Sequence, residues 1–425
     1  MRRRRFLGAA LAAGVTGGCA DGGDGRTLDF LSLAWQRETV AVTRALVAAW
    51  NRENPHRRVR YVQGSWDTVH DQLLTSFEGG EAPDVIHDEA ADLTDFAHGG
   101  YLTDLTGLLP APLRRQIPEA TWDMTRIAGG IHGVPLLQEP RVLIANRELL
   151  ERGGVRVPDV QHPWSWEEFE DAAKELTRAG TYGVAWSMNE PVNQSVNLAL
   201  TTGGRVLRRE DGRAVVRFGP EESRVPELIR RQVNTDRTAP RGGLSMGGAE
   251  TLPGFFAGRY ALLPLNFSFR RQVRQQAPDG FGWLTLPLPS GDPAAGGGPE
   301  QGVSPQTLSV ARDTAHPRTA VDFIAYLAAP DRMARLARAD RLLPTSRAAL
   351  RDPGLATEGD GGRTGLALAA HLRASPVLGV RGYPEWSDKA ATPALQQYYG
   401  GAIGLRELRE RLVTDGNRIL ARYRR

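Results

Sequence analysis

The 425-residue chain has the composition of a globular protein, with 41% hydrophobic and 24% charged residues. A chain of this length exceeds what one hydrophobic core ordinarily supports, so we expect two or more lobes. The formal charge of +4 comes from Arg2–Arg5, because the rest of the chain carries as many acidic as basic side chains. A neutral body gives no electrostatic reason to expect binding to nucleic acid or to an anionic membrane surface.

The start of the chain predicts an export signal. Arg2–Arg5 precede the apolar run Phe6–Val15, which is shorter than the about 20 residues that a transmembrane helix needs. The sequence RRRFL at residues 3–7 resembles the twin-arginine export pattern. Cys19 follows two glycines, as in bacterial lipoprotein signals, where the cysteine becomes the lipidated first residue. Thr16 departs from that pattern, which prefers leucine, and an ordinary signal with an incidental cysteine is the alternative.

Cys19 is the only cysteine of the sequence, which excludes disulfides within the chain and cysteine-based zinc sites. Residues 20–26 (ADGGDGR) have the composition of a flexible tether. We therefore expect an exported lipoprotein at the outer face of the cytoplasmic membrane, with residues 1–26 as signal and tether.

Strands and helices alternate after the tether. The first helix carries apolar side chains at the spacing i, i+3, i+4, i+7 and i+8 from Val42 to Trp50, and it ends at Asn54-Pro55. This β-α-β-α-β rhythm predicts a mostly parallel sheet covered by helices on both faces. The first elements are a strand at residues 28–34, this helix, a strand at 59–62, a helix at 69–77 and a strand at 83–89.

The middle of the chain continues the alternation. Ser165 and Glu168 can form a capping box at a helix start, with Trp164 and Phe169 at the two hydrophobic-staple positions. Further predicted elements are strands at residues 142–146, 182–186, 260–266 and 281–289, a helix around 250–259, a loop at 291–302, a strand at 307–311, one long helix at 318–339 and helical material to the C-terminus.

Five motifs follow one another in this chain: GVP at residues 133–135, WSWEEF at 164–169, FFAGRYALLPL at 255–265, HPRTAVDF at 316–323 and LPT at 343–345. In this order they resemble the solute-binding proteins of ABC importers, specifically the carbohydrate-binding group that includes maltose-binding protein. The resemblance spans the chain from about residue 28 to its end. One such motif alone would not identify the family; the five together in this order carry the resemblance.

The resemblance implies an α/β fold of the periplasmic-binding-protein-like type II, with two lobes joined by crossing hinge strands. One lobe would combine residues 27–138 with 303–343, and the other 142–290 with 346–425. A ligand would sit in the cleft and be trapped by hinge closure. It also implies a monomeric binding protein without cofactor or catalysis, which hands its sugar to the permease of an ABC importer.

Tryptophans, amides and carboxylates recur just beyond the predicted strands, where open α/β sheets bind ligands. A sugar presents apolar C–H patches that indoles can cover and hydroxyls that carboxylates and amides can bind. The candidate ligand-binding residues are Trp35, Gln36, Trp66, Asp88, Glu89, Glu139, Trp186, Asn189, Asn266 and Trp386.

Each candidate also has a purely structural interpretation. The tryptophans could be core rings, Asp88 or Glu89 could cap a helix or lie in a turn, and Glu139 could serve the hinge. The ligand could instead be a polyol, a sugar acid or a glycerol phosphate. Two facing tryptophans would favour a sugar, whereas Arg37 and Arg270 pointing into the cleft would favour an anion.

Signals for other chemistry are weaker. Residues 243–247 match G-x-S-x-G but follow a polar, breaker-rich run and not a strand, which argues against a hydrolase nucleophile. Neighbouring acids in residues 84–92 point to opposite faces of a strand, which argues against a metal site. A secreted glycoside hydrolase remains the rival from another class, since it needs two carboxyls in one cleft, drawn here from Asp88, Glu89, Glu139 and Glu190.

Overall fold

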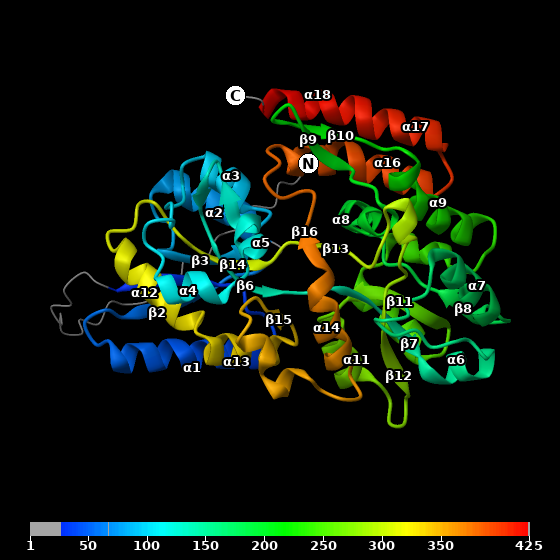
Figure 1. Cartoon of the computed structure of the whole chain (residues 1–425), viewed down its shortest axis with the longest axis horizontal. Coiled ribbons are helices and arrows are strands. Elements are labelled where there is room, and N and C mark those ends of the chain that lie inside the picture. Colours follow the sequence, from blue (N-terminus) through cyan, green and yellow to red (C-terminus); the bar gives the residue numbers. More distant parts are fainter. Residues whose placement is uncertain (1–26, 67, 424–425) are drawn as a thin grey trace, which may run out of the picture.

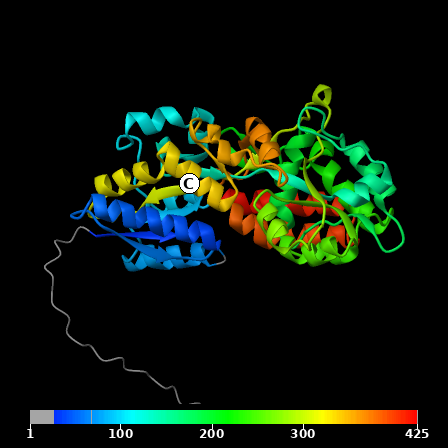
Figure 2. The same ribbon diagram turned by 90° about the horizontal axis from the view of Figure 1, so that it is seen from below.

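The computed structural model describes residues 27–66 and 68–423, which form two lobes side by side (Figure 1 and Figure 2). Each lobe is built on its own β-sheet. The predictions of an export signal, a twin-arginine pattern and a lipidated Cys19 lie outside the described residues. The two-lobed α/β architecture that the sequence predicts is confirmed.

The sheet of the first lobe has the strand order β15-β6-β14-β3-β1-β2. β1, β2 and β3 are parallel, as predicted, but β14 is antiparallel to both of its neighbours, so the sheet is mixed. Its strands are β1 (Leu28–Ser32), β2 (Val59–Gln63), β3 (Val85–Glu89), β6 (Val134–Gln138), β14 (Gln306–Val310) and β15 (Leu343–Pro344).

Helices cover both faces of this sheet, because alternate strand residues point to opposite sides. Phe30 belongs to a core shared with α1, α12 and α13, whereas its neighbour Leu31 belongs to a core shared with α2 and α3. The helices of this lobe are α1 (Arg37–Glu53), α2 (Val69–Gly79), α3 (Leu93–His98), α4 (Ala111–Gln116), α5 (Glu119–Trp122), α12 (Pro317–Leu327) and α13 (Pro330–Asp340). A short hairpin adds β4 (Arg126–Ile127) and β5 (Gly130–Ile131).

The single helix predicted over residues 318–339 is wrong, since the structure divides it into α12 and α13. Pro330 lacks an N–H to continue the helical hydrogen bonds and disfavours a helical conformation in the residue before it. Accordingly, Ala329 is extended, and Pro330 occupies the first turn of α13, where a proline is well tolerated.

The sheet of the second lobe has the order β12-β7-β11-β8. β7 is antiparallel to β12 and β11, and only the β11–β8 pair in this sheet is parallel. Its strands are β7 (Arg141–Asn146), β8 (Tyr182–Val184), β11 (Tyr260–Asn266) and β12 (Trp283–Pro287). One face packs on α7 and α9 and the other on α10, α11 and α14. The helices are α6 (Arg147–Gly153), α7 (Trp166–Leu176), α8 (Pro191–Leu198), α9 (Pro220–Asn234), α10 (Gly248–Phe256), α11 (Phe269–Gln276) and α14 (Gly362–Leu368).

The start of α7 confirms the predicted capping box. The Glu168 N–H donates to Ser165 Oγ at 3.1 Å, and the Ser165 N–H donates to Glu168 Oε2 at 2.8 Å. Trp164 and Phe169 are both buried, and their ring centroids are 6.4 Å apart. The local pattern therefore fixes this helix start as expected.

The C-terminal helices pack on the second lobe beside a β-hairpin, at the top of Figure 1. They are α15 (Tyr383–Trp386), α16 (Thr392–Tyr399), α17 (Leu405–Glu410) and α18 (Gly416–Leu420), and the hairpin strands are β9 (Leu207–Glu210) and β10 (Arg213–Val216). Among the described residues, no helix combines the length and apolar character needed to traverse a bilayer.

Within residues 27–66 and 68–423 the chain passes between the two sheets three times. Glu139 and Pro140 connect β6 to β7, and β13 (Gln301–Val303) leads from the second lobe into β14. The third passage leaves β15 and reaches α14 on the second lobe. β13 also pairs in parallel with β16 (Leu372–Ala374), near the junction of the lobes in Figure 1. These passages bring the ends of strands from both sheets together.

Candidate functional site

A cavity of about 470 Å³ lies at the junction of the two lobes and is lined by residues from both. This volume falls in the range of about 300–1,000 Å³ typical of small-molecule sites. Its polar lining includes the carboxylates Glu89, Asp92, Glu139, Glu190 and Asp388, and the amides Asn189, Asn193, Asn197 and Asn266.

The positions of these side chains follow from the ends of the elements that carry them. Glu89 is the last residue of β3 in the first lobe, and Asn266 is the last residue of β11 in the second. Glu139 lies in the first passage between the lobes, and Glu190 immediately precedes α8. The cavity is therefore located where the carboxyl ends of strands leave their sheets, as expected for α/β proteins.

Glu139 ties the first passage to the second lobe. Its Oε1 accepts a hydrogen bond from Asn266 Nδ2 at 3.3 Å, and its Oε2 accepts one from the Ser268 N–H at 3.0 Å. Burial raises the pKa of Glu139, and the hydrogen bonds from Ser268 oppose that rise. The carboxylate thus connects a hinge segment to the cavity wall.

The acidity of Glu89 is strongly shifted by its surroundings. Burial raises the pKa of Glu89 to about 7, and the charge of Asp92 adds to the rise. Glu139 and Glu190 contribute further repulsion, while a hydrogen bond from the Ser304 side chain opposes it. Negative charge from both lobes and from the passage between them therefore acts on Glu89.

The amides on α8 form a connected row. Asn197 Nδ2 donates to Asn193 Oδ1 at 2.7 Å, and Asn197 Oδ1 accepts from Ser375 Oγ at 2.7 Å. Gly302 of β13 passes so close that a Cβ there would lie 2.2 Å from Asn197 Oδ1. The glycine therefore permits the close approach of the crossing strand to this row.

Two further lining residues differ in chemistry from the acids and amides. Arg141 is the one basic residue among the described lining residues; burial lowers its pKa, while Glu139 and Glu190 oppose that shift. Tyr383, the first residue of α15, is the one aromatic side chain among them. Burial, together with the charge of Glu89, raises the pKa of Tyr383, so its phenol stays protonated.

The structure brings four of the predicted site residues together. Glu89, Glu139, Asn189 and Asn266 all line the cavity. Sequence reasoning missed Asn197, Ser375 and Tyr383 as lining residues. The sequence could have suggested Tyr383, because it lies three positions before the candidate Trp386 in the same YPEWSD segment.

Trp186 and Trp386 require a correction, since both are core side chains with 1% exposure and neither lines the cavity. Trp186 Nε1 donates to Gln232 Oε1 of α9 at 2.8 Å. Trp386 Nε1 donates to the Leu412 carbonyl at 3.2 Å. Because distant segments satisfy both indole N–H groups, burial costs little, and the rings pack the second lobe.

The other four candidates also lie outside the cavity lining. Asp88 and Gln36 are buried; Asp88 Oδ1 accepts from the Glu89 N–H at 2.8 Å. Burial raises the pKa of Asp88 well above its usual value, and the charge of Asp92 adds to this. Trp66 packs edge-on against His87, with the two ring centroids 5.6 Å apart. Trp35 is 55% exposed.

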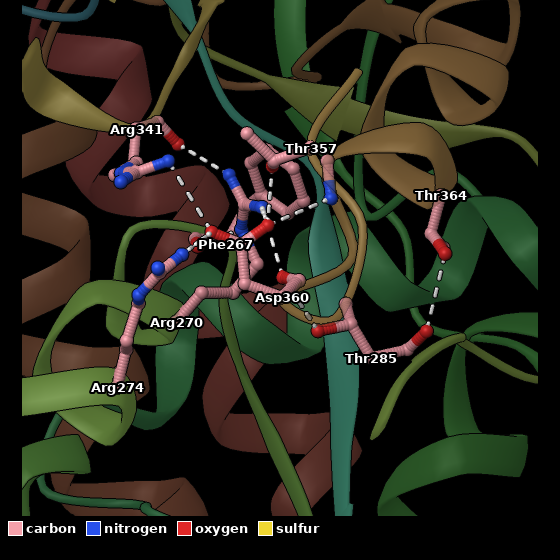
Figure 3. Close-up of polar contacts among 9 residues, drawn as sticks. Phe267, Arg270, Arg274, Thr285, Arg341, Thr357, Asp360 and Thr364 are labelled. Atoms are coloured by element: carbon pink, nitrogen blue, oxygen red, sulfur yellow. Dashed lines mark hydrogen bonds and ion pairs between the residues drawn. The ribbon is translucent and has the colours of Figure 1, made fainter. Parts of the chain in front are cut away.

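Arg270, a sequence candidate for anion binding, is held by a buried carboxylate instead (Figure 3). Its Nη1 lies 3.3 Å from Asp360 Oδ1, and its Nη2 donates to the Arg341 carbonyl at 2.9 Å. Arg274 and Arg341 also reach Asp360 Oδ2, at 3.4 and 3.3 Å. We call these four residues the Asp360 cluster. It joins α11 of the second lobe to the end of α13 of the first.

Two motifs with alternative chemistry have ordinary structural settings. Residues 243–247 overlap a 3-10 helix, Arg241–Ser245, and do not form a strand-to-helix elbow. In the part of the chain that the structure describes, no group of three or more His, Cys, Asp or Glu side chains is arranged to hold a metal ion.

Comparisons with known proteins agree with this architecture. The family model described as "Bacterial extracellular solute-binding protein" matches residues 34–334. A Streptomyces antibioticus protein described as "Uncharacterized lipoprotein in oleD 5'region" is 53% identical over 96% of this chain and 91% of its own length.

Solved structures with similar folds include a receptor and a sugar-binding protein. The GacH receptor of Streptomyces glaucescens, determined unliganded and with acarbose, has a TM-score of 0.77 at 21% identity, covering 93% of this chain and 98% of its own. The cyclic alpha-maltosyl-1,6-maltose binding protein of Arthrobacter globiformis has a TM-score of 0.79 at 16% identity, covering 93% and 99%. The predicted periplasmic-binding-protein-like fold is confirmed, and this chain belongs to the bacterial extracellular solute-binding protein family.

Proposed function

We propose that this protein captures a sugar, either a mono- or an oligosaccharide, in the cavity between its lobes and delivers it to the permease of an ABC importer. The observation that carries the proposal is the lining itself. Carboxylates and amides supply acceptors and donors for hydroxyl groups, and Tyr383 supplies one aromatic side chain. The descriptions of similar folds with acarbose or a cyclic maltosyl sugar support a carbohydrate as the guest.

Lobe closure follows from the division of the chain that we propose. One lobe combines residues 27–138 with 303–343, and the other combines 142–290 with 346–425. Because Glu89 and Asn266 belong to different lobes in this division and line the same cavity, a guest that binds both holds the two lobes together. The guest therefore stabilises the closed form by its differential affinity, which a permease can recognise.

We also propose that the chain is held at the outer face of the membrane through a lipid on Cys19. The sequence pattern around Cys19 and the lipoprotein description of the Streptomyces antibioticus relative support this anchor. Replacing Cys19 with serine should release the protein into the medium of cells that export it. Retention of the Cys19→Ser protein on the membrane would contradict the lipid anchor.

An anionic guest such as a sugar acid or glycerol phosphate fits the lining poorly. Five carboxylates of the described residues line the cavity, against the single guanidinium of Arg141. Arg270 is engaged in the Asp360 cluster, and Arg37 does not line the cavity. A polyol remains compatible with the lining, since it offers the same hydroxyl groups.

The test is a calorimetric titration of the mature chain against neutral sugars, polyols and sugar acids. We expect a neutral or cationic sugar to bind with a dissociation constant near 1 μM, about −8 kcal/mol. The double variant Asn193→Ala/Asn266→Ala should weaken this binding at least about tenfold, since each amide loses its bonds to the guest. Absence of binding to every sugar, or recovery of a cleaved sugar, would overturn the proposal.

A further inference from the structure

The charge of the cavity lining goes beyond what hydroxyl recognition needs. Among the described residues, the lining holds five carboxylates and one guanidinium, a formal excess of four negative charges. They come from both lobes and from the passage between them: Glu89 ends β3, Asp92 precedes α3, Glu139 joins β6 to β7, Glu190 precedes α8, and Asp388 follows α15.

Protein cations compensate little of this charge. Asp92 contacts His70 Nδ1 at 3.0 Å. Within the described residues, none of the other four lining carboxylates has a lysine, arginine or histidine nitrogen within 4.0 Å. Arg141 interacts electrostatically with Glu139 and Glu190, but it makes no ion pair within 4.0 Å with a carboxylate of the described residues.

The carboxylates are also close enough to repel one another. Asp92, Glu139 and Glu190 each disfavour the ionised form of Glu89, so repulsion acts between the first lobe, the passage and the second lobe. Like charges on facing walls oppose closure of the lobes, unless a cation lies between them.

The acids do not converge as metal ligands do. No described group of three or more His, Cys, Asp or Glu side chains is arranged for a metal ion, although five carboxylates line this one cavity. Spread over a cavity of about 470 Å³, they suit a larger guest that carries its charge on an organic frame. Tyr383 adds one aromatic side chain to the lining, and aromatic rings attract cations as well as apolar sugar patches.

We propose that the guest of this cavity is an amine-bearing sugar, that is, an amino sugar or an oligosaccharide with at least one protonated amino group. This rests on the proposed function, since it specifies the class of sugar for the same cavity. The ammonium lies between Glu89 and Glu190, and the hydroxyls bind the asparagine row of α8. The charge thus links recognition to closure, because the carboxylates of the two lobes share one cation.

The test uses three forms of each sugar that differ at one substituent. Calorimetric titration compares glucose, galactose and mannose with their 2-amino-2-deoxy forms and with the N-acetylated amino sugars. A second series compares β-1,4-linked dimers and trimers of glucose, glucosamine and N-acetylglucosamine. We expect at least one amine form to bind about tenfold or more tightly than both of its neutral counterparts. Raising the salt from about 0.05 M to about 0.5 M should weaken amine binding and leave neutral binding unchanged.

Two variants assign the preference to the cavity. The double variant Glu89→Gln/Glu190→Gln keeps the size and hydrogen-bonding capacity of both side chains and should reduce the preference for the amine to less than about threefold. Glu410→Gln, at an exposed position on α17 outside the lining, is the matched control and should keep the full preference. Circular dichroism and thermal unfolding establish that each variant is folded.

The outcomes separate the two proposals. If a neutral form binds as tightly as its amine, the amine inference is overturned and the sugar-binding proposal stands. If the preference persists in the double variant, the assignment to Glu89 and Glu190 fails. If none of the sugars binds, both proposals fail together.

Discussion

The Asp360 cluster offers a quantitative test of how the two lobes are joined. In the variant Asp360→Asn, the side-chain volume is kept but the charge that faces Arg270 is lost. Arg270 and Asp360 are each 3% exposed, so the change leaves a buried guanidinium without its counter-ion. Breaking a buried pair in this way costs about 3–5 kcal/mol.

The structure places the expected cost near the lower end of that range. Arg270 keeps hydrogen bonds to the carbonyls of Phe267, Asp360 and Arg341, at 3.0, 2.9 and 2.9 Å. Arg274 is largely exposed and adds at most about 1 kcal/mol. We therefore expect Asp360→Asn to lower the free energy of unfolding by about 3 kcal/mol.

Urea unfolding followed by tryptophan fluorescence measures this difference. Asp322→Asn is the matched control, because its pair with Arg57 at 2.8 Å has side chains 50% and 43% exposed. The control should cost no more than about 1 kcal/mol. Equal losses for the two variants would refute the reasoning that burial makes the Asp360 cluster important.

Three further predictions concern the cavity and the core. Trp186→Ala should destabilise the protein by about 3–5 kcal/mol in thermal or urea unfolding, since the ring is a core side chain; a loss of sugar affinity with unchanged stability would contradict its placement. Gly302→Ala should lower the sugar affinity measured by calorimetry, because the added Cβ would lie 2.2 Å from Asn197 Oδ1. In the double variant with Asn197→Ala, the clash should be relieved but the affinity should not be restored. Burial and neighbouring acids raise the folded-state pKa of Glu89 to about 7 from 4.5, so its contribution to stability is full below about pH 4.5 and is lost as the pH rises through about 7. The melting temperature of the wild type should therefore fall relative to that of Glu89→Gln over this window, and parallel profiles would contradict the shifted pKa.

Local patterns predicted the elements well where neighbouring residues decide the structure. The capping box at Ser165 and Glu168 depends on two residues three positions apart, and it forms as expected. Pro330 is an equally local signal that a long helix breaks, and it should have excluded a single helix over residues 318–339. The two-lobed fold was expected from the family resemblance that the five motifs carry.

The site was harder to predict because burial depends on distant partners. Trp186 and Asn189 follow the same short strand, but Trp186 turns into the core, where Gln232 accepts its N–H, whereas Asn189 lines the cavity. No spacing in the sequence reveals the pairing of Trp186 with a residue on α9. Residues that end a strand or lie in a passage between lobes, such as Glu89 and Glu139, were predictable from that position alone.

A crystal structure of the protein with its tightest-binding sugar tests the central claim most directly. We expect difference density for the sugar between the lobes, within hydrogen-bonding distance of Glu89, Glu139 or the asparagines of α8 and in contact with Tyr383. Trp186 should still be buried. Density at any other surface, or in a cavity lined by exposed indoles, would contradict it.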